Sequence, residues 1–152
     1  SPNGCIISNG LASMGIALPG GIAAKIVDPK RNVVSVMGDG GALMNFQEIE
    51  TAKRLGLGFV ILILNDNNYG LIKWKQRMHR GDSVGTELSN PDFVMLAKSF
   101  GVNAYKPNSY NEFNQLLKDA LEQQTLTVIE VPITTDVNDE LTNELKNYFD
   151  GR

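Results

Sequence analysis

The stretch VVSVMGDGG at residues 33–41 decides the fold, because an apolar run ends there on an acid set among glycines. Its first five residues are rich in β-branched side chains, as in strands buried within parallel sheets. A second apolar run, FVILIL at 59–64, ends in a similar way on NDNNYG at 65–70. Ligands of open parallel sheets bind outside the carboxyl ends of the strands. The sequence therefore predicts that both polar turns lie at one edge of one sheet.

The rest of the chain predicts helices that alternate with strands. The 10–27 stretch is apolar nearly all round, and we expect Pro19 and the glycines after it to kink or interrupt its helix. Asn90 is expected to cap a helix that starts at Pro91. Residues 77–90 are expected to form a mobile loop. This pattern predicts an α/β fold with an open, mainly parallel sheet and helices on both faces, in a single domain over 1–152. The other predicted elements are helices at 43–55, 110–122 and 138–149 and a strand at 127–131.

Composition excludes several classes of protein. The chain has 152 residues, a net charge of −3 and 42% hydrophobic residues, which is ordinary for a globular domain. A chain with this charge is not expected to bind nucleic acid, and no apolar stretch is long enough to cross a membrane. A single cysteine excludes a disulfide framework. We expect a cytoplasmic protein, and the start at Ser1 suggests a piece of a longer polypeptide.

The acid at residue 39 suggests a metal site. Backbone N–H groups of the neighbouring glycines can converge on phosphate oxygens at a helix N-terminus. Asp39 would repel those phosphates unless a hard cation lay between them, and Mg²⁺ commonly combines few carboxylates with substrate phosphates. Asp66 is the second candidate ligand, together with a backbone carbonyl. The alternative interpretation is a tight turn with Asp39 as N-cap, and a polar turn of left-handed residues at 65–70.

The two motifs, in this order and at this spacing, resemble the signature of thiamine diphosphate enzymes. The flanking stretch SNGLASMGIALP at 8–19 is similar to the segment that supports the aminopyrimidine ring in acetolactate synthases. The block QEIETA at 47–52 resembles the same family, and the resemblance continues to about Pro132. It implies the thiamine diphosphate-binding fold, lacking its first strand and helix.

The resemblance also implies a role for each matched position. Asp39 and Asp66 are matched to the first and second Mg²⁺ ligands, and Asn68 to the residue whose backbone carbonyl is the third. Ala12 is matched to a carbonyl that accepts from the cofactor's amino group, and Met14 to the side chain that holds the cofactor bent. The remaining expected cofactor-binding residues are Ser13, Gly38, Gly40, Gly41, Tyr69, Gly70 and Leu71.

The implied activity is the condensation of two pyruvates to 2-acetolactate and carbon dioxide, with thiamine diphosphate and Mg²⁺ as cofactors. Asp66, where the biosynthetic branch has Asn, resembles the catabolic, flavin-independent branch. The activating glutamate of the family lies in another domain, so we expect no catalytic residue here and no activity from this chain alone. The resemblance implies further N-terminal domains and a second subunit as partners, in a homo-oligomer. Alternatives are a pyruvate oxidase, a 2-oxoacid decarboxylase or a non-catalytic thiamine diphosphate-binding module.

Overall fold

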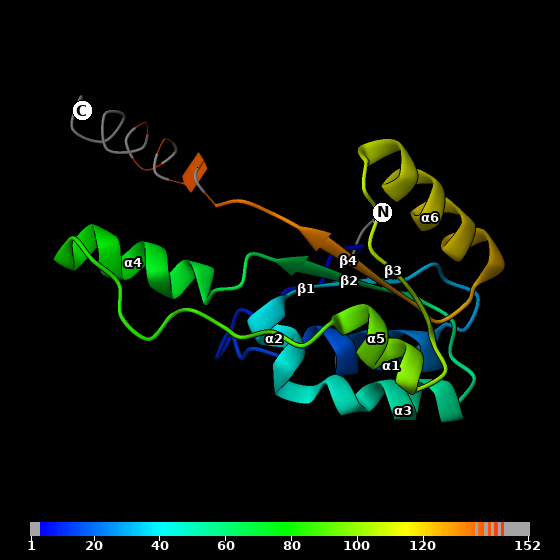
Figure 1. Cartoon of the computed structure of the whole chain (residues 1–152). Coiled ribbons are helices and arrows are strands. Elements are labelled where there is room, and N and C mark those ends of the chain that lie inside the picture. The colour runs from blue at the N-terminus through cyan, green and yellow to red at the C-terminus, as the bar shows by residue number, and fades with distance from the viewer. Residues whose placement is uncertain (1–3, 136, 139, 141, 143, 145–152) are drawn as a thin grey trace.

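The computed structural model describes residues 4–135, 137, 138, 140, 142 and 144. Its strands form one four-stranded sheet in the order β1-β2-β4-β3, and every pairing is parallel (Figure 1). This architecture confirms the predicted α/β class. Gly38 at the end of the first strand pairs with Leu64, so the two strands that carry the acids end side by side. The strands are β1 (Val34–Gly38), β2 (Val60–Asn65), β3 (Asn103–Tyr105) and β4 (Thr127–Pro132).

Helices cover both faces of the sheet, as predicted (Figure 1). Alternate residues of β2 point to opposite faces: Ile61 and Ile63 pack in the larger core, and Val60 packs in the smaller one. The larger core contains side chains from α1 (Ala17–Val27), α2 (Asp39–Asn45), α3 (Ile49–Arg54) and α5 (Phe93–Ser99), and the smaller core is covered by α6 (Tyr110–Gln123).

The first helix is shorter than predicted. It begins at Ala17 rather than at residue 10. Ala12 and Gly15 have φ angles of 49° and 86°, which place both in the left-handed region and exclude a right-handed helix that continues through residues 12–15. Pro19 therefore falls in the first turn, where its missing N–H costs no intrahelical bond. The expected kink at this proline is wrong for that reason.

Two further predictions need correction. The helix expected at 43–55 begins at Asp39 and is broken by a 3₁₀ turn at Phe46–Glu48. The α5 helix is capped by Asp92, whose side chain accepts from the Met95 backbone N–H at 2.8 Å, so Asn90 is not its cap. The strand β3 was not predicted, because three residues are too few to show a period.

The α4 helix (Gly70–Arg80) extends away from the sheet, and none of its residues is buried (Figure 1). It includes residues 77–80 of the expected loop. After it the chain returns toward the sheet through an antiparallel bridge between Asn68 and Glu87. The helix expected at 138–149 lies mostly outside the described residues. Among the described helices, none has the length and apolar character needed to cross a bilayer.

Candidate functional site

Asp39 is the first residue of α2, directly after β1, and it is only 2% exposed. Gly38 occupies the cap position in an extended conformation, and no side chain makes a capping hydrogen bond there. The interpretation of Asp39 as an N-cap is therefore wrong. Its carboxylate instead accepts from the Asn90 side-chain amide, with 2.6 Å between Asn90 Nδ2 and Asp39 Oδ2. A buried acid that does not cap its helix is a candidate for ligand binding.

The turn after β2 is shaped by its own amides. Asn67 has a φ of 55°, and its backbone N–H donates to Asn65 Oδ1 at 3.0 Å. The Asn68 N–H donates to Asp66 Oδ1 at 3.0 Å, so local bonds fix the aspartate in place. The Asn68 side-chain amide donates to the Asp66 carbonyl and accepts from Lys73 Nζ. The expected contribution of Asn68 to a metal site, the backbone carbonyl, stays a prediction.

The two acids interact electrostatically. Burial raises the pKa of Asp66 above its ordinary value, and the negative charge of Asp39 adds to the rise. Hydrogen bonding from the Asn68 amide opposes both effects. A cation between the two carboxylates would offset the repulsion that Asp66 experiences from Asp39. The site thus contains two acids of the predicted set close enough to influence each other.

The donor set fits Mg²⁺ better than a transition metal. It consists of carboxylate and carbonyl oxygens, which hard cations prefer. Within the described part of the chain, no group of three or more His, Cys, Asp or Glu side chains could hold a metal ion. Two protein carboxylates leave coordination positions for substrate phosphates and water, as Mg²⁺ usually requires.

Gly40 and Gly70 permit close approach around the acids. A Cβ atom added to Gly40 would lie 2.7 Å from the Tyr69 ring and 3.3 Å from the Met14 side chain. At Gly70 an added Cβ would lie 2.5 Å from Asp66 Oδ2. Larger residues would therefore displace the side chains that surround the predicted site. The fold brings together Met14, Gly40 and Tyr69 from three separate segments.

The structure places the other predicted site residues less closely around Asp39 and Asp66. Gly41 lies beside the 12–15 segment, since its added Cβ would be 3.8 Å from the Gly15 backbone nitrogen. Ala12 and Ser13 are exposed in the irregular segment before α1, and Ala12 has a left-handed backbone. Leu71 is 63% exposed on the first turn of α4. Cofactor contacts for Ala12, Ser13 and Leu71 stay predictions.

Sequence reasoning missed a set of residues behind the acids. Asn90 was expected to cap a helix, and Asn65 and Glu130 were given no role. Glu130 is 3% exposed, and its carboxylate accepts from Asn65 Nδ2 at 2.9 Å and from Lys106 Nζ at 2.8 Å. The signal that could have found Glu130 is an acid within the apolar run 127–131. These side chains line a hollow of about 450 Å³ at the carboxyl ends of the strands.

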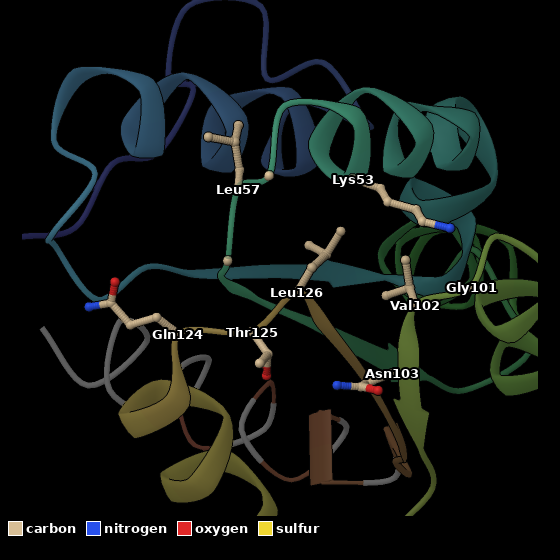
Figure 2. Close-up of a pocket in the computed structure, with 10 residues that line it drawn as sticks. Lys53, Leu57, Gly101, Val102, Asn103, Gln124, Thr125 and Leu126 are labelled. Carbon is tan, nitrogen blue, oxygen red and sulfur yellow. The ribbon is translucent and has the colours of Figure 1, made fainter.

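A second hollow, of about 300 Å³, lies at the opposite end of the sheet (Figure 2). It is lined by residues near the amino ends of the strands, including Lys53 of α3, Leu57 of the following loop and Asn103, the first residue of β3. Lys53 Nζ donates to the Phe100 carbonyl at 2.6 Å, so its ammonium group is already bound to the backbone. The predicted ligands lie at the other end, where open parallel sheets bind their ligands.

Comparison with known proteins identifies the family of this chain. The family described as "Thiamine pyrophosphate enzyme, C-terminal TPP binding domain" matches residues 1–131. The chain is 33% identical over 139 residues to an acetolactate synthase of Bacillus subtilis, covering 91% of this chain and 24% of the relative. It is 34% identical over 140 residues to a catabolic acetolactate synthase of Raoultella terrigena, covering 92% of this chain and 25% of the relative.

A solved structure gives the same result. The thiamine diphosphate-dependent 4-hydroxybenzoylformate decarboxylase of Rhodococcus jostii RHA1 matches with a TM-score of 0.75 and 30% identity, over 81% of this chain and 24% of that one. The chain thus spans about a quarter of the length of these proteins. The family match, the relatives and the shared fold confirm the resemblance read from the sequence, and the chain belongs to the thiamine pyrophosphate enzymes as their C-terminal cofactor-binding domain.

Proposed function

We propose that this chain is the Mg²⁺- and thiamine diphosphate-binding domain of an acetolactate synthase-like enzyme. That enzyme would join two pyruvates to give 2-acetolactate and one carbon dioxide. The observation that carries the proposal is the placement of Asp39 and Asp66 at adjacent strand ends, where burial and the charge of Asp39 both raise the pKa of Asp66. Relatives with 33–34% identity that are named acetolactate synthases support the choice of reaction.

Each residue of the site has a defined part in this proposal. Asp39, Asp66 and the Asn68 carbonyl hold Mg²⁺, and the backbone N–H groups of Gly40 and Gly41 bind the diphosphate. Met14, which lies next to Gly40, would support the cofactor's ring system. When bound, thiamine diphosphate supplies the stabilisation of negative charge on carbon that decarboxylation of a 2-oxoacid requires. The residues of this chain bind and orient the cofactor.

Catalysis is proposed to need more than this chain. Its relatives are about four times as long. We place the carboxylate that activates the cofactor in the remaining part of the protein, and the second half of the cofactor site on another subunit of a homo-oligomer. The domain over 1–152 would then bind cofactor weakly and turn over no pyruvate when isolated, because only the diphosphate half of the ligand would find its partners.

A 2-oxoacid decarboxylase is the second candidate function. The observation in its favour is the solved relative from Rhodococcus jostii, which is named a decarboxylase. A pyruvate oxidase or a non-catalytic cofactor-binding module are further alternatives. Decarboxylase, oxidase and synthase would use the same metal and diphosphate ligands in this domain and would differ in how the rest of the protein handles substrate.

Product analysis of the full-length protein with pyruvate, Mg²⁺ and thiamine diphosphate tests the proposal. We expect acetolactate and carbon dioxide in a ratio of one to one. Acetaldehyde would instead identify a decarboxylase, and acetyl phosphate an oxidase. Calorimetric titration with thiamine diphosphate, with and without Mg²⁺, completes the test. Binding without turnover would indicate the non-catalytic module, and cofactor binding that does not depend on Mg²⁺ would contradict the metal site.

A further inference from the structure

The side-chain nitrogen of Asn90 is surrounded by three oxygens. It lies 2.6 Å from Asp39 Oδ2, 3.0 Å from Asn65 Oδ1 and 3.2 Å from Asn67 Oδ1. The shortest of these distances is to the charged acceptor, as expected for a charge-assisted hydrogen bond. One amide therefore ties the acid after β1 to the turn after β2.

The orientation of the Asn90 amide is fixed by these neighbours. Turning it over would place its oxygen against the Asp39 carboxylate and two amide oxygens, which repel it. In the orientation present, Asn90 Oδ1 is buried and has no hydrogen-bond partner in the part of the chain that the structure describes. A buried polar atom without a partner costs free energy. The position of Asn90 is thus better explained by the three oxygens around its side-chain nitrogen than by a contribution of this residue to stability.

Asn65 is oriented from the other side. Its nitrogen donates to Glu130 Oε1 at 2.9 Å, so its oxygen must face the Asn67 N–H and the Asn90 amide. Asn65 is 8% exposed and Glu130 only 3%, which leaves little freedom to either side chain. Lys106 Nζ, 2.8 Å from the same Glu130 oxygen, neutralises the buried carboxylate. A continuous line of hydrogen bonds runs from Lys106 to Asp39.

We propose that Asn90 is a positioning residue for the metal ligand Asp39, and that Asn65 and Glu130 hold Asn90 in place. By binding one oxygen of Asp39, the Asn90 amide fixes the plane of the carboxylate and leaves the other oxygen to an incoming divalent cation. Fixed carboxylates bind metal more tightly, because less freedom is lost when the ion arrives. This inference rests on the proposed function, since it concerns the metal site described there.

The test uses the full-length protein and Mn²⁺ as a spectroscopic substitute for Mg²⁺. Electron paramagnetic resonance measures free Mn²⁺ in the presence of thiamine diphosphate, and thermal unfolding without metal measures the fold. We expect Asn90→Ala to lower Mn²⁺ affinity about 10- to 100-fold, the range typical of residues that orient a ligand. Asn90→Ser retains a donor and should recover part of the loss. Glu130→Gln keeps an acceptor without the charge, and its effect should be smaller than that of Asn90→Ala.

The matched control is Asn103→Ala, which removes an exposed asparagine at the opposite end of the sheet (Figure 2). Its Mn²⁺ affinity should equal that of the unaltered protein. If Asn90→Ala folds and binds Mn²⁺ as tightly as the unaltered protein, the positioning role is wrong although the metal site stands. Equal losses in Asn90→Ala and Asn103→Ala would also overturn it. Absence of Mn²⁺ binding by the unaltered protein would overturn the proposed function, and this inference with it.

Discussion

The two ends of the sheet use polar side chains in different ways. At the amino ends, Lys25 and Gln124 donate their shortest hydrogen bonds to backbone carbonyls, and Lys25 Nζ also lies 3.4 Å from Gln124 Oε1. Lys25, which is 2% exposed, donates to the carbonyls of Pro29 and Arg31 at 2.6 and 2.9 Å. Gln124 Nε2 likewise donates to the carbonyl of Lys30 at 3.0 Å. At the carboxyl ends, side chains bind one another, as Asn90 binds Asp39 and Asn65.

This difference distinguishes polar side chains that stabilise the fold from polar side chains that serve binding. Carbonyls in loops need donors, and a buried lysine that supplies them stabilises the fold directly. Asp39 and Asp66 follow adjacent strands instead, and the charge of Asp39 helps to raise the pKa of Asp66. Such an arrangement lowers the stability of the metal-free domain and is relieved by a cation. Substitutions at the amino end should therefore lower stability, whereas those at the carboxyl end should change binding and alter stability only slightly.

The largest effect is expected at the amino end, for Gly58→Ala. A Cβ at this position would overlap the backbone carbonyl of Gln124, which cannot move as a flexible side chain could. We expect the free energy of unfolding to fall by about 4 kcal/mol, at the upper end of overpacking effects. Urea denaturation measures it. Gly20→Ala is the control, because nothing lies within 4 Å of its added Cβ and stability should hold or rise. Equal stability of the two variants would contradict the prediction.

At the carboxyl end, Asp39→Ala should weaken Mg²⁺-dependent binding of thiamine diphosphate by at least about 100-fold, more than loss of an orienting residue usually costs. The fold should remain, since the variant also removes a charge that contributes to the raised pKa of Asp66. Calorimetric titration of the full-length protein measures the affinity. Asp28→Ala, which removes an exposed acid before β1, should bind normally. Unfolding of Asp39→Ala would instead indicate a structural role for this acid.

Lys25→Met tests the structural side of the comparison. The variant keeps most of the side-chain volume but removes the donor to two loop carbonyls. We expect a loss of about 2 kcal/mol in the free energy of unfolding, as for hydrogen bonds to charged groups. Affinity for thiamine diphosphate should not change. Lys98→Met, at an exposed position of α5, is the control and should have unaltered stability. If Lys25→Met changed cofactor affinity but not stability, the proposed difference between the two ends of the sheet would be wrong.

The smallest effect concerns Asp66 and pH. Because its folded-state pKa is raised above 3.8, the folded protein binds this proton more tightly than the unfolded chain does. Stability of the metal-free protein should therefore fall as pH rises from 3.8 through the raised pKa. Mg²⁺ affinity should rise over the same interval, since the ion binds the ionised acid.

The Asp66→Asn variant should lack the pH-dependent contribution to stability that the titration of Asp66 makes. Its stability relative to the unaltered protein should grow across that interval and level off at about 0.5 kcal/mol, because solvent screens a partly exposed charge. Thermal unfolding at a series of pH values, with chelator present, measures the difference. A gap that is constant from acid to neutral pH would show that titration of Asp66 is not its cause.

Much of the fold could be predicted because its signals are local. The β-branched runs that become β1 and β2, and the polar turns that follow them, placed the two acids at one edge of the sheet. The interruption of the helix after Asp39 could not be predicted in this way, since its apolar spacing continues through the 3₁₀ turn. The start of α1 was missed because a helical apolar pattern does not reveal the left-handed backbone at Ala12.

The sequence by itself determined the sheet class, the family and the pair of acids, because periodicity and turn chemistry depend on near neighbours. Only the tertiary structure decided what surrounds those acids. Asp92 caps α5 in place of Asn90, and Asn90 binds Asp39, which is 51 residues away in the sequence. The pairing of β2 with β4 brought Glu130 beside Asn65. Hydrogen bonds between residues so far apart in the chain depend on strand order, which local sequence patterns do not contain.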